Sequence, residues 1–416
     1  MLEGVYRRCS DPRSRWVCSL VGVSVCLQLL ICRDPLGGDY QVRQAAIQTG
    51  RPGTPYLNLL EPPSLIETFL QHPPESFLPV NLCRPERFVP GFLTPFDLLT
   101  TLDGSVKRIP YSILFSRPFL KLRTLFAGTT VSEYLVYPVS LDPGELVSYA
   151  LEQLEKLKAH CLILKDIPLN SPLLTADENH AATQLLSHCR KAGFQILSGQ
   201  SLAYVPIDFT SIEEYLQRLS YSRRKSLRRK LRSRCRVEVE EIPTGDRFFS
   251  EESIVRQLFD LYLNVYRQSK IHFDRLTFPF FCSLFQERSH RGIVFIYRRE
   301  KTIIGYNICF IHNGNLVDKY VGFVYPDARA ENLYFLSWFY NLEYAIKHQL
   351  KYYIAGWTDP EVKAFLGARF TFTHHAVYFK NPLLRSVSKK LKRFFESDQR
   401  WYDASRRASL DREHPV

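Results

Sequence analysis

Residues 292–323 read GIVFIYRREKTIIGYNICFIHNGNLVDKYVGF. Short polar breaks divide this stretch into three runs rich in β-branched and aromatic residues, which are Gly292–Tyr297, Thr302–Ile311 and Asn315–Phe323. The second break contains Asn313-Gly314, a dipeptide that favours a tight hairpin turn because both residue types tolerate positive φ. The stretch therefore predicts a three-stranded meander, and this meander fixes how the neighbouring segments must pack.

The segments on both sides of the meander continue an alternation of strand and helix periods. The predicted elements are a strand at Val237–Ile242, helices at Ser253–Gln268 and Phe278–Glu287, and, after the meander, a helix at Asn332–His348, a strand at Tyr352–Gly356, a short helix at Pro360–Leu366 and a strand at Thr371–Lys380. Strands and helices in this order predict one α/β domain with a mixed sheet.

A less regular alternation of strands and helices precedes this domain in the sequence. The predicted elements are strands at Ser105–Pro118, Leu122–Tyr137, Cys161–Ile167, Phe194–Leu197 and Leu202–Ile207, with helices at Gly144–His160 and Glu178–Ala192. From Gly37 to about Pro95 the chain is rich in proline, which predicts a linker followed by irregular loops. The 416 residues suit two domains of similar size.

The composition is that of a folded protein with anionic partners. Hydrophobic residues make up 45% of the chain and aromatic residues 13%, which excludes a disordered chain. The formal net charge of +13 favours nucleic acid, an acidic membrane surface or a phosphorylated cofactor as a partner. The 10 cysteines form no CxxC pair, so the sequence predicts neither a metal site nor a disulfide framework.

The N-terminal segment carries an apolar stretch, Trp16–Cys32, after several arginines. Its length is at the lower limit for spanning a bilayer, and no clear cleavage site follows it. We interpret it as an uncleaved anchor or a consequence of a mis-assigned start codon, in preference to an export signal. The predicted location is the cytoplasm, with this segment as a route to membrane association.

A second conspicuous feature is the basic run Arg223–Arg236, which follows a helix cap at Ser211. Leu227 and Leu231 fall at helical spacing, so one stripe can pack inward while cations crowd the other faces. Such a concentration of positive charge attracts phosphates. A solvated helix face or a localisation signal is the alternative interpretation. A further basic segment begins at Arg385 and can lie on an acidic membrane surface.

Five motifs add to the element order. They are the basic opening Tyr221–Arg229, Gly305 in the second strand of the meander, Asp318-Lys319-Tyr320-Val321-Gly322 in the third, Tyr325-Pro326 after it, and Lys363 four residues before Gly367. In this order they resemble the Gcn5-related N-acetyltransferase (GNAT) superfamily, and in particular its FemAB-like and BioF2-like branch. The resemblance covers about Asp208 to Asn381, with weaker support back to about Pro79.

This resemblance implies an α/β fold with tandem acyl-CoA N-acyltransferase-like (GNAT) domains, each a mixed sheet flanked by helices. The corresponding division is an N-terminal extension at residues 1–45, an N-terminal GNAT-like domain with a proline-rich entry at 46–207, a C-terminal GNAT/BioF2-like acyltransferase domain at 208–384 and a basic tail at 385–416.

Enzymes of this branch align an amine with a thioester or ester carbonyl, and they need no covalent intermediate. The site must deprotonate the amine and stabilise the carbonyl oxygen as it becomes negative. The candidates for these catalytic roles are Asp318, Tyr320 and Glu343. Because side chains alternate along a strand, we expect Asp318 and Tyr320 to share one face and to act as a pair.

The donor is expected to be acyl-CoA or aminoacyl-tRNA, and no other bound cofactor is expected. Lys363 resembles the lysine that contacts the anionic end of the donor in Fem-like transferases, and Arg223, Arg224, Lys225 and Arg228 are candidates for binding donor phosphates. Residues Val324–Asn332 contain no glycine, whereas ordinary acetyl-CoA-binding members carry a glycine-rich loop there. The choice between the two donors therefore stays open.

The expected function is transfer of an acyl or aminoacyl group to an amine, which can belong to a cell-envelope precursor. One alternative is a nucleic-acid-binding module that uses residues 223–236, with affinity that falls steeply as salt rises. The other is a non-catalytic scaffold that keeps the fold and binds a partner. The partners under the first interpretation are the acyl donor, tRNA among them, and the amine acceptor.

Overall fold

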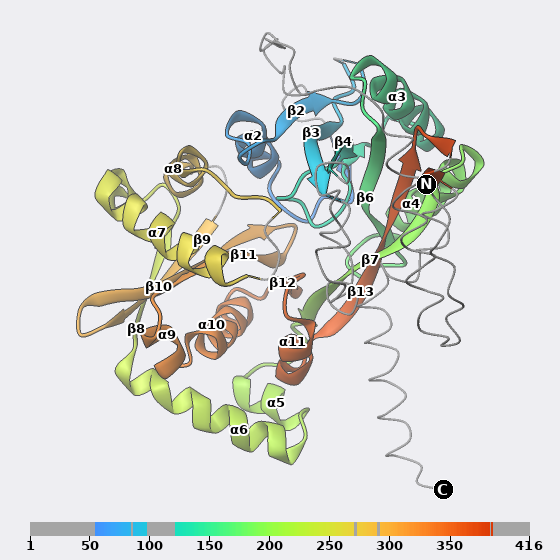
Figure 1. Ribbon diagram of the computed structural model, residues 1–416. Coiled ribbons are helices and arrows are strands. Elements are labelled where there is room, and N and C mark those ends of the chain that lie inside the picture. Colours follow the sequence, from blue (N-terminus) through green and yellow to red (C-terminus); the bar gives the residue numbers. More distant parts are fainter. Residues whose placement is uncertain are drawn as a thin grey trace, which may run out of the picture.

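The computed structural model describes residues 55–84, 86–97, 121–269, 273–288, 292–382 and 384–385. The fold is mixed α/β, with helices on both faces of a large sheet (Figure 1). This sheet has 11 strands in the order β2-β3-β4-β6-β13-β7-β12-β11-β10-β9-β8. The predicted strand Ser105–Pro118, the stretch Trp16–Cys32 and most of the basic segment from Arg385 lie outside the described residues.

The first half of the chain, residues 55–206, supplies one end of the sheet. Its elements are β1 (Tyr56–Leu57), α2 (Pro63–Gln71), β2 (Leu78–Asn81), β3 (Pro90–Asp97), β4 (Lys121–Ala127), β5 (Tyr137–Pro138), α3 (Pro143–Lys156), β6 (Cys161–Leu169), α4 (Ala176–Lys191) and β7 (Gln195–Pro206). The predicted helices begin at side-chain caps, since Asp142 accepts from the first turn of α3 and Thr175 forms a capping box with Glu178 in α4.

The prediction of irregular loops up to Pro95 is wrong, because that segment contains α2, β2 and part of β3. Its prolines occupy positions that tolerate a missing N–H. Pro63 is the first residue of α2, and Pro79 lies in β2 at the edge of the sheet. Pro95 lies in β3 beyond Leu93, the last residue that pairs with β2.

The second half, residues 212–379, contains the predicted meander and the helices that cover it. Its elements are α5 (Ile212–Gln217), α6 (Tyr221–Leu231), the 3₁₀ helix η4 (Arg232–Arg236), β8 (Glu238–Pro243), η5 (Arg247–Ser250), α7 (Glu252–Gln268), α8 (Phe278–Gln286), β9 (Gly292–Arg299), β10 (Thr302–His312), β11 (Asn315–Phe323), α9 (Asp327–Ala330), α10 (Leu333–Lys347), β12 (Tyr352–Gly356), α11 (Pro360–Leu366) and β13 (Arg369–Phe379). The meander is confirmed as β9, β10 and β11, with φ of 48° at Asn313 and 78° at Gly314 in the second turn.

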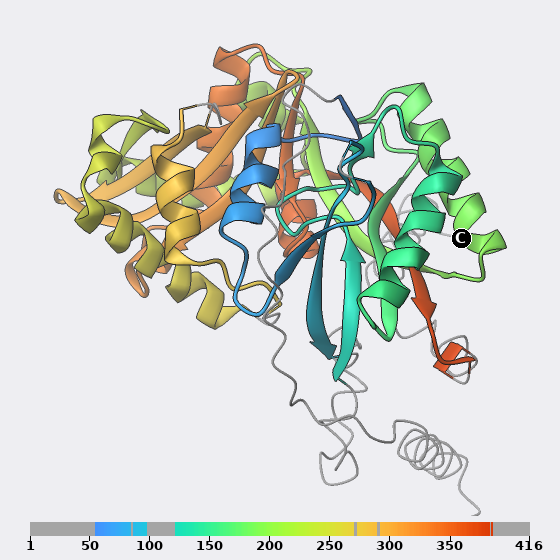
Figure 2. The ribbon, with the colours of Figure 1, turned by 90° about the horizontal axis from the view of Figure 1, so that it is seen from above.

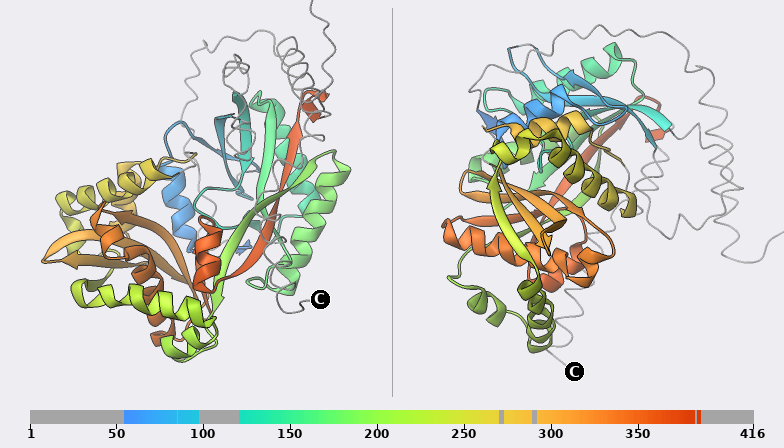
Figure 3. Two further views of the ribbon diagram at one scale, coloured as in Figure 1. Left: turned by 60° about the horizontal axis from the view of Figure 1, so that its bottom comes forward. Right: turned by 90° about the vertical axis from the view of Figure 1, so that its left-hand side faces the viewer.

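The last strand of the second half joins the sheet of the first half. β13 lies between β6 and β7 and pairs antiparallel with both, and β7 in turn pairs with β12. Figure 3 shows β13 running alongside β7 away from the rest of the second half. The two halves therefore share one hydrogen-bonded sheet.

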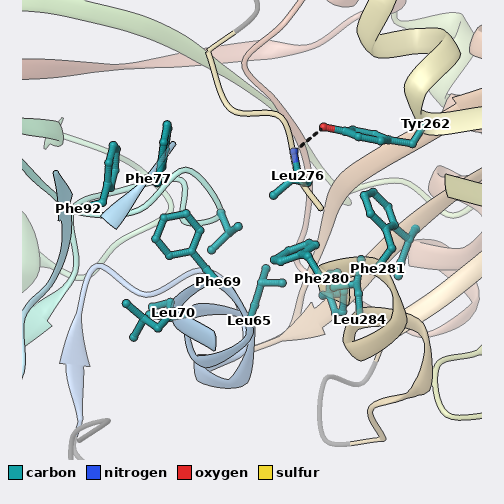
Figure 4. Packing of buried hydrophobic residues seen from close by; sticks show 14 of the residues in the cluster. Leu65, Phe69, Leu70, Phe77, Phe92, Tyr262, Leu276, Phe280, Phe281 and Leu284 are labelled. Atoms are coloured by element: carbon teal, nitrogen blue, oxygen red, sulfur yellow. Dashed lines mark hydrogen bonds between the residues drawn. The ribbon is translucent and has the colours of Figure 1, made fainter. Parts of the chain in front are cut away.

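Helices divide the second half into two faces. α7 and α8 lie on one face of β9, β10 and β11, and α10 lies on the other together with α5 and α6 (Figure 1). α2 of the first half also packs on the α8 side, as Figure 2 shows from above. In Figure 4, Leu65 of α2 points toward Phe280 and Leu284 of α8, whereas the Phe69 ring points toward Phe77 and Phe92. This apolar contact joins the two halves on the α7/α8 face.

We predict that Phe280→Ala lowers the free energy of unfolding by about 3–5 kcal/mol, because it removes a fully buried ring from this contact. Tyr221→Ala is the control, since Tyr221 is 72% exposed and its loss should cost less than about 0.5 kcal/mol. Denaturant unfolding of both variants measures the difference. Equal effects of the two substitutions would contradict this description of the contact.

Candidate active site

The candidate site lies where β11 and β12 stop pairing. These strands are parallel, and their register contains only Asn315↔Tyr352, Leu316↔Tyr353 and Val317↔Ile354. β11 continues to Phe323 without β12 as its neighbour. The carboxyl ends of neighbouring parallel strands are where open α/β sheets bind ligands.

A β-bulge at Lys319 controls which way the side chains of β11 point. Cys309 of β10 pairs with Asp318, and the next residue back, Ile308, pairs with Tyr320, so Lys319 is an extra residue. Asp318 consequently faces α10, whereas Tyr320 faces α7 and α8. The expectation that Asp318 and Tyr320 share a face is wrong, because the inserted residue breaks the alternation on which it rested.

Asp318 is held by a network of neutral donors on the α10 face. Its Oδ2 accepts hydrogen bonds from Tyr353 Oη at 2.8 Å and from Asn341 Nδ2 at 3.0 Å. Asn341 Oδ1 in turn accepts from Asn307 Nδ2 at 3.0 Å. The other oxygen, Oδ1, is buried and has no hydrogen-bond partner in the described part of the chain. Burial raises the pKa of Asp318, although the bond from Tyr353 and the nearby Lys363 amine act to lower it.

Lys363, on α11, brings a buried amine to the same place. The residue is 5% exposed, and within the described ranges its Nζ has neither a hydrogen bond nor an ion pair. Burial lowers the pKa of Lys363 to about 8, against the attraction of Asp318, Glu133 and Asp359. A Cβ built on Gly356 would lie 3.9 Å from Lys363 Nζ and 3.9 Å from the backbone oxygen of Asp318, so these groups surround one point at the end of β12.

Two other predicted catalytic residues lie apart from Asp318 and Lys363. The Tyr320 ring packs between Tyr262, Phe280 and Phe281 on the α7/α8 face, and burial there raises its pKa. The Glu343 side chain is 37% exposed and forms an ion pair with Arg234 at 2.7 Å. The structure therefore brings together Asp318 and Lys363, and it does not add Tyr320 or Glu343 to them.

The cations of the basic helix α6 fall into two groups: some donate hydrogen bonds to backbone carbonyls, and others are exposed to solvent. The guanidinium of Arg223 donates to the backbone oxygens of Ala364 and Phe365, at the end of α11, with Nε 2.7 Å from the Phe365 oxygen. Arg224 donates to the Leu219 oxygen at 2.6 Å. Arg223 and Arg224, both predicted to bind donor phosphates, therefore donate hydrogen bonds to backbone carbonyl oxygens. Because α11 carries Lys363, Arg223 also helps to place that amine.

Three further cations of α6, and Arg232 just after it, point outward, whereas Lys230 lies over the Phe335 ring. Lys225 and Arg228, both predicted to bind phosphates, are exposed, and so are Arg229 and Arg232. Their spacing of three and four residues puts them on one stripe, which we call the outer stripe. None of them forms an ion pair with a described residue. An exposed stripe of unneutralised cations favours a polyanionic ligand.

Sequence reasoning missed a buried ion cluster on the other side of β11. Lys319 Nζ lies 2.7 Å from Glu61 Oε1 and 2.5 Å from Glu133 Oε1, and the exposed fractions of these side chains are 6%, 0% and 4%. Both acids belong to the first half, 258 and 186 residues from Lys319 in sequence. The sequence signal for this cluster was a lysine inside an apolar strand. No local pattern, however, identifies Glu61 and Glu133 as its partners, because they lie so far away in the sequence.

The described residues contain no group of three or more His, Cys, Asp or Glu side chains arranged to hold a metal ion. Among the described helices, none is both long and apolar enough to cross a bilayer.

A family profile described as FemAB-like, peptidoglycan biosynthesis/recognition, matches residues 154–415, which is more than half of the chain. The chain belongs to the FemAB-like family. This membership confirms the resemblance inferred from the motifs. It also supports the activity of an acyl or aminoacyl transferase. No curated protein matches the chain.

Several solved structures resemble this FemAB-like chain at low identity. L-PGS from Bacillus licheniformis is 11% identical with a TM-score of 0.45, covering 80% of this chain and 98% of that one. FemX is 10% identical with a TM-score of 0.45, covering 78% and 97%. A tandem GNAT protein from the clavulanic acid biosynthesis pathway is 13% identical with a TM-score of 0.38, covering 81% and 92%.

We predict that Arg223→Ala lowers the free energy of unfolding by about 2 kcal/mol, because it removes charged hydrogen bonds to the carbonyls that end α11. Arg228→Ala removes the same side chain from an exposed position of the same helix and should change stability by less than about 0.5 kcal/mol. Denaturant unfolding measures both. A larger effect at Arg228 would contradict the division of α6 into two faces.

Lys363→Met should make the protein more stable at pH 7, by about 3 kcal/mol. The pKa of Lys363 is lowered to about 8 in the folded protein, so the unfolded chain binds more protons between pH 8 and about 10.4. Below pH 8, the cost of burying the protonated Lys363 amine therefore lowers the free energy of unfolding of the wild type in full. This cost disappears as the pH rises from 8 to about 10.4. Unfolding of both proteins at pH 7 and pH 10 measures the difference, and a difference that stays constant would contradict the burial of a charged amine.

Proposed function

We propose that this protein transfers an acyl or aminoacyl group from an activated ester or thioester to an amine, at the carboxyl ends of β11 and β12. The observation that carries the proposal is the buried Lys363 amine, without a hydrogen-bond partner among the described residues, beside Asp318. A preorganised cation in a buried site stabilises the negative charge that develops on a carbonyl oxygen during acyl transfer.

In this proposal, Lys363 is the group that contacts the carbonyl oxygen. Its pKa of about 8 keeps most of the amine protonated at neutral pH while burial strengthens its field. Asp318 favours the protonated form of Lys363, and the Tyr353 and Asn341 hydrogen bonds fix the position of Asp318. The remaining contribution is alignment of amine and carbonyl, which lowers the barrier without a covalent intermediate.

The outer stripe of α6 supports a donor that carries phosphates. Lys225, Arg228, Arg229 and Arg232 are exposed on one side of the helix whose Arg223 holds the end of α11. Both acyl-CoA and aminoacyl-tRNA meet this requirement. The description of the family favours an acceptor amine on a cell-envelope precursor. The stripe alone also suits a non-catalytic nucleic-acid-binding module, which the following experiment separates from an enzyme.

The test is transfer of a radiolabelled group from acyl-CoA or aminoacyl-tRNA to the free amine of an alanine-containing peptide. The wild type should transfer from one donor, and Lys363→Ala should lower kcat by about 100-fold or more, because it removes a preorganised oxyanion-binding cation. Lys351→Ala, at an exposed lysine just before β12, is the matched control and should keep wild-type turnover. Binding of tRNA without transfer of any group would instead favour the nucleic-acid-binding module.

A further inference from the structure

The basic helix α6 carries an exposed aromatic ring beside its exposed cations. Tyr221, the first residue of α6, is 72% exposed. The other Phe, Tyr and Trp side chains of the described residues are buried or half-buried. Tyr221 forms neither a hydrogen bond nor a ring contact through its side chain with the part of the chain that the structure describes. A single exposed aromatic residue is ordinary on a protein surface, so its place on the helix decides its meaning.

Helical geometry puts Tyr221 inside the outer stripe. Successive residues turn by about 100° around a helix axis, and Arg232, just after α6, keeps helical dihedral angles. Measured from Tyr221, Arg228 lies at about −20°, Arg232 at about 20°, Lys225 at about 40° and Arg229 at about 80°. The ring therefore has cations on both sides within one arc of about 100°.

The opposite side of α6 faces the protein. Leu227 is buried, Arg223 donates to the carbonyl oxygens that end α11, and the Lys230 amine lies 4.0 Å from the centre of the Phe335 ring. On the same scale these three residues lie at about 240°, 200° and 180°. Tyr221 and the outer stripe thus occupy the side of the helix that is turned away from these contacts.

An aromatic ring flanked by cations is the combination that binds nucleotides. The ring stacks on a base, and the cations bind the phosphates. We propose that Tyr221 stacks on a nucleobase of the acyl donor while Lys225 and Arg228 bind the donor phosphates. This assignment rests on the proposed function, in which the donor is acyl-CoA or aminoacyl-tRNA. Both donors carry an adenine base as well as phosphates, whereas the cations alone would attract any polyanion.

The test compares ligands with and without a base. Calorimetric titration measures the binding of coenzyme A, of a short RNA that ends in CCA, and of inorganic tripolyphosphate, which has the charge but no base. Tyr221→Ala should weaken binding of the base-bearing ligand by about 5-fold or more and change the affinity for tripolyphosphate by less than about twofold, because only stacking is lost. Tyr221→Phe keeps the ring and should bind like the wild type. The preferred ligand, coenzyme A or RNA, distinguishes the two donors.

Arg228→Ala is the matched variant for charge on the same stripe. It should weaken the binding of the base-bearing ligand and of tripolyphosphate alike, and it should make binding less dependent on salt. Tyr221→Ala should leave the salt dependence unchanged, because the ring carries no charge. Both residues are exposed, so the Tm of each variant should match that of the wild type.

Three results would overturn the assignment of Tyr221. They are an unchanged affinity of Tyr221→Ala for the base-bearing ligand, an equal loss of affinity for tripolyphosphate, and a wild type that binds phosphatidylglycerol vesicles but neither coenzyme A nor RNA. The last result would identify the stripe as a surface for an acidic membrane, which also suits tyrosine and cations on one helix face. A loss confined to the base-bearing ligand, in a protein that transfers no group, would keep the nucleotide site and overturn the proposed function instead.

Discussion

The single extra residue in β11 determines how the rest of the candidate site is arranged. Because Lys319 is inserted opposite β10, Asp318 points to the α10 face, and Lys319 and Tyr320 point to the opposite side of the sheet. Asp318 then accepts hydrogen bonds from Tyr353 and Asn341 on the α10 face, and Lys319 forms ion pairs with two acids from the first half. A regular strand would put Asp318 and Tyr320 on one face and would leave one of these networks unmade.

The two halves of the chain depend on each other for the site. β13 leaves the second half and inserts between β6 and β7, and α2 of the first half packs on α8. Glu61 and Glu133 reach β11 from the first half, where both form ion pairs with Lys319. Alignment of two substrates requires a rigid frame, and a shared sheet with a buried ion cluster supplies one.

The sequence predicted those parts of the structure whose signals are local. The meander, its Asn313-Gly314 turn, α10 and α11 follow from periodicity and turn residues. Lys363 and Asp318 followed from short motifs, and they do lie together. The bulge at Lys319 has no sequence signature, so the pairing of Asp318 with Tyr320 was wrongly expected. The partners of Lys319 and Arg223 lie more than a hundred residues away, beyond the reach of spacing arguments.

The most direct test of the account is a crystal structure of the protein with a non-reactive donor analogue whose carbonyl is retained. The account predicts that the carbonyl oxygen lies within hydrogen-bond distance of Lys363 Nζ, next to Gly356 and the free end of β11, with the donor phosphates toward the outer stripe of α6. A carbonyl bound on the α7/α8 face beside Tyr320, away from Lys363, would contradict it.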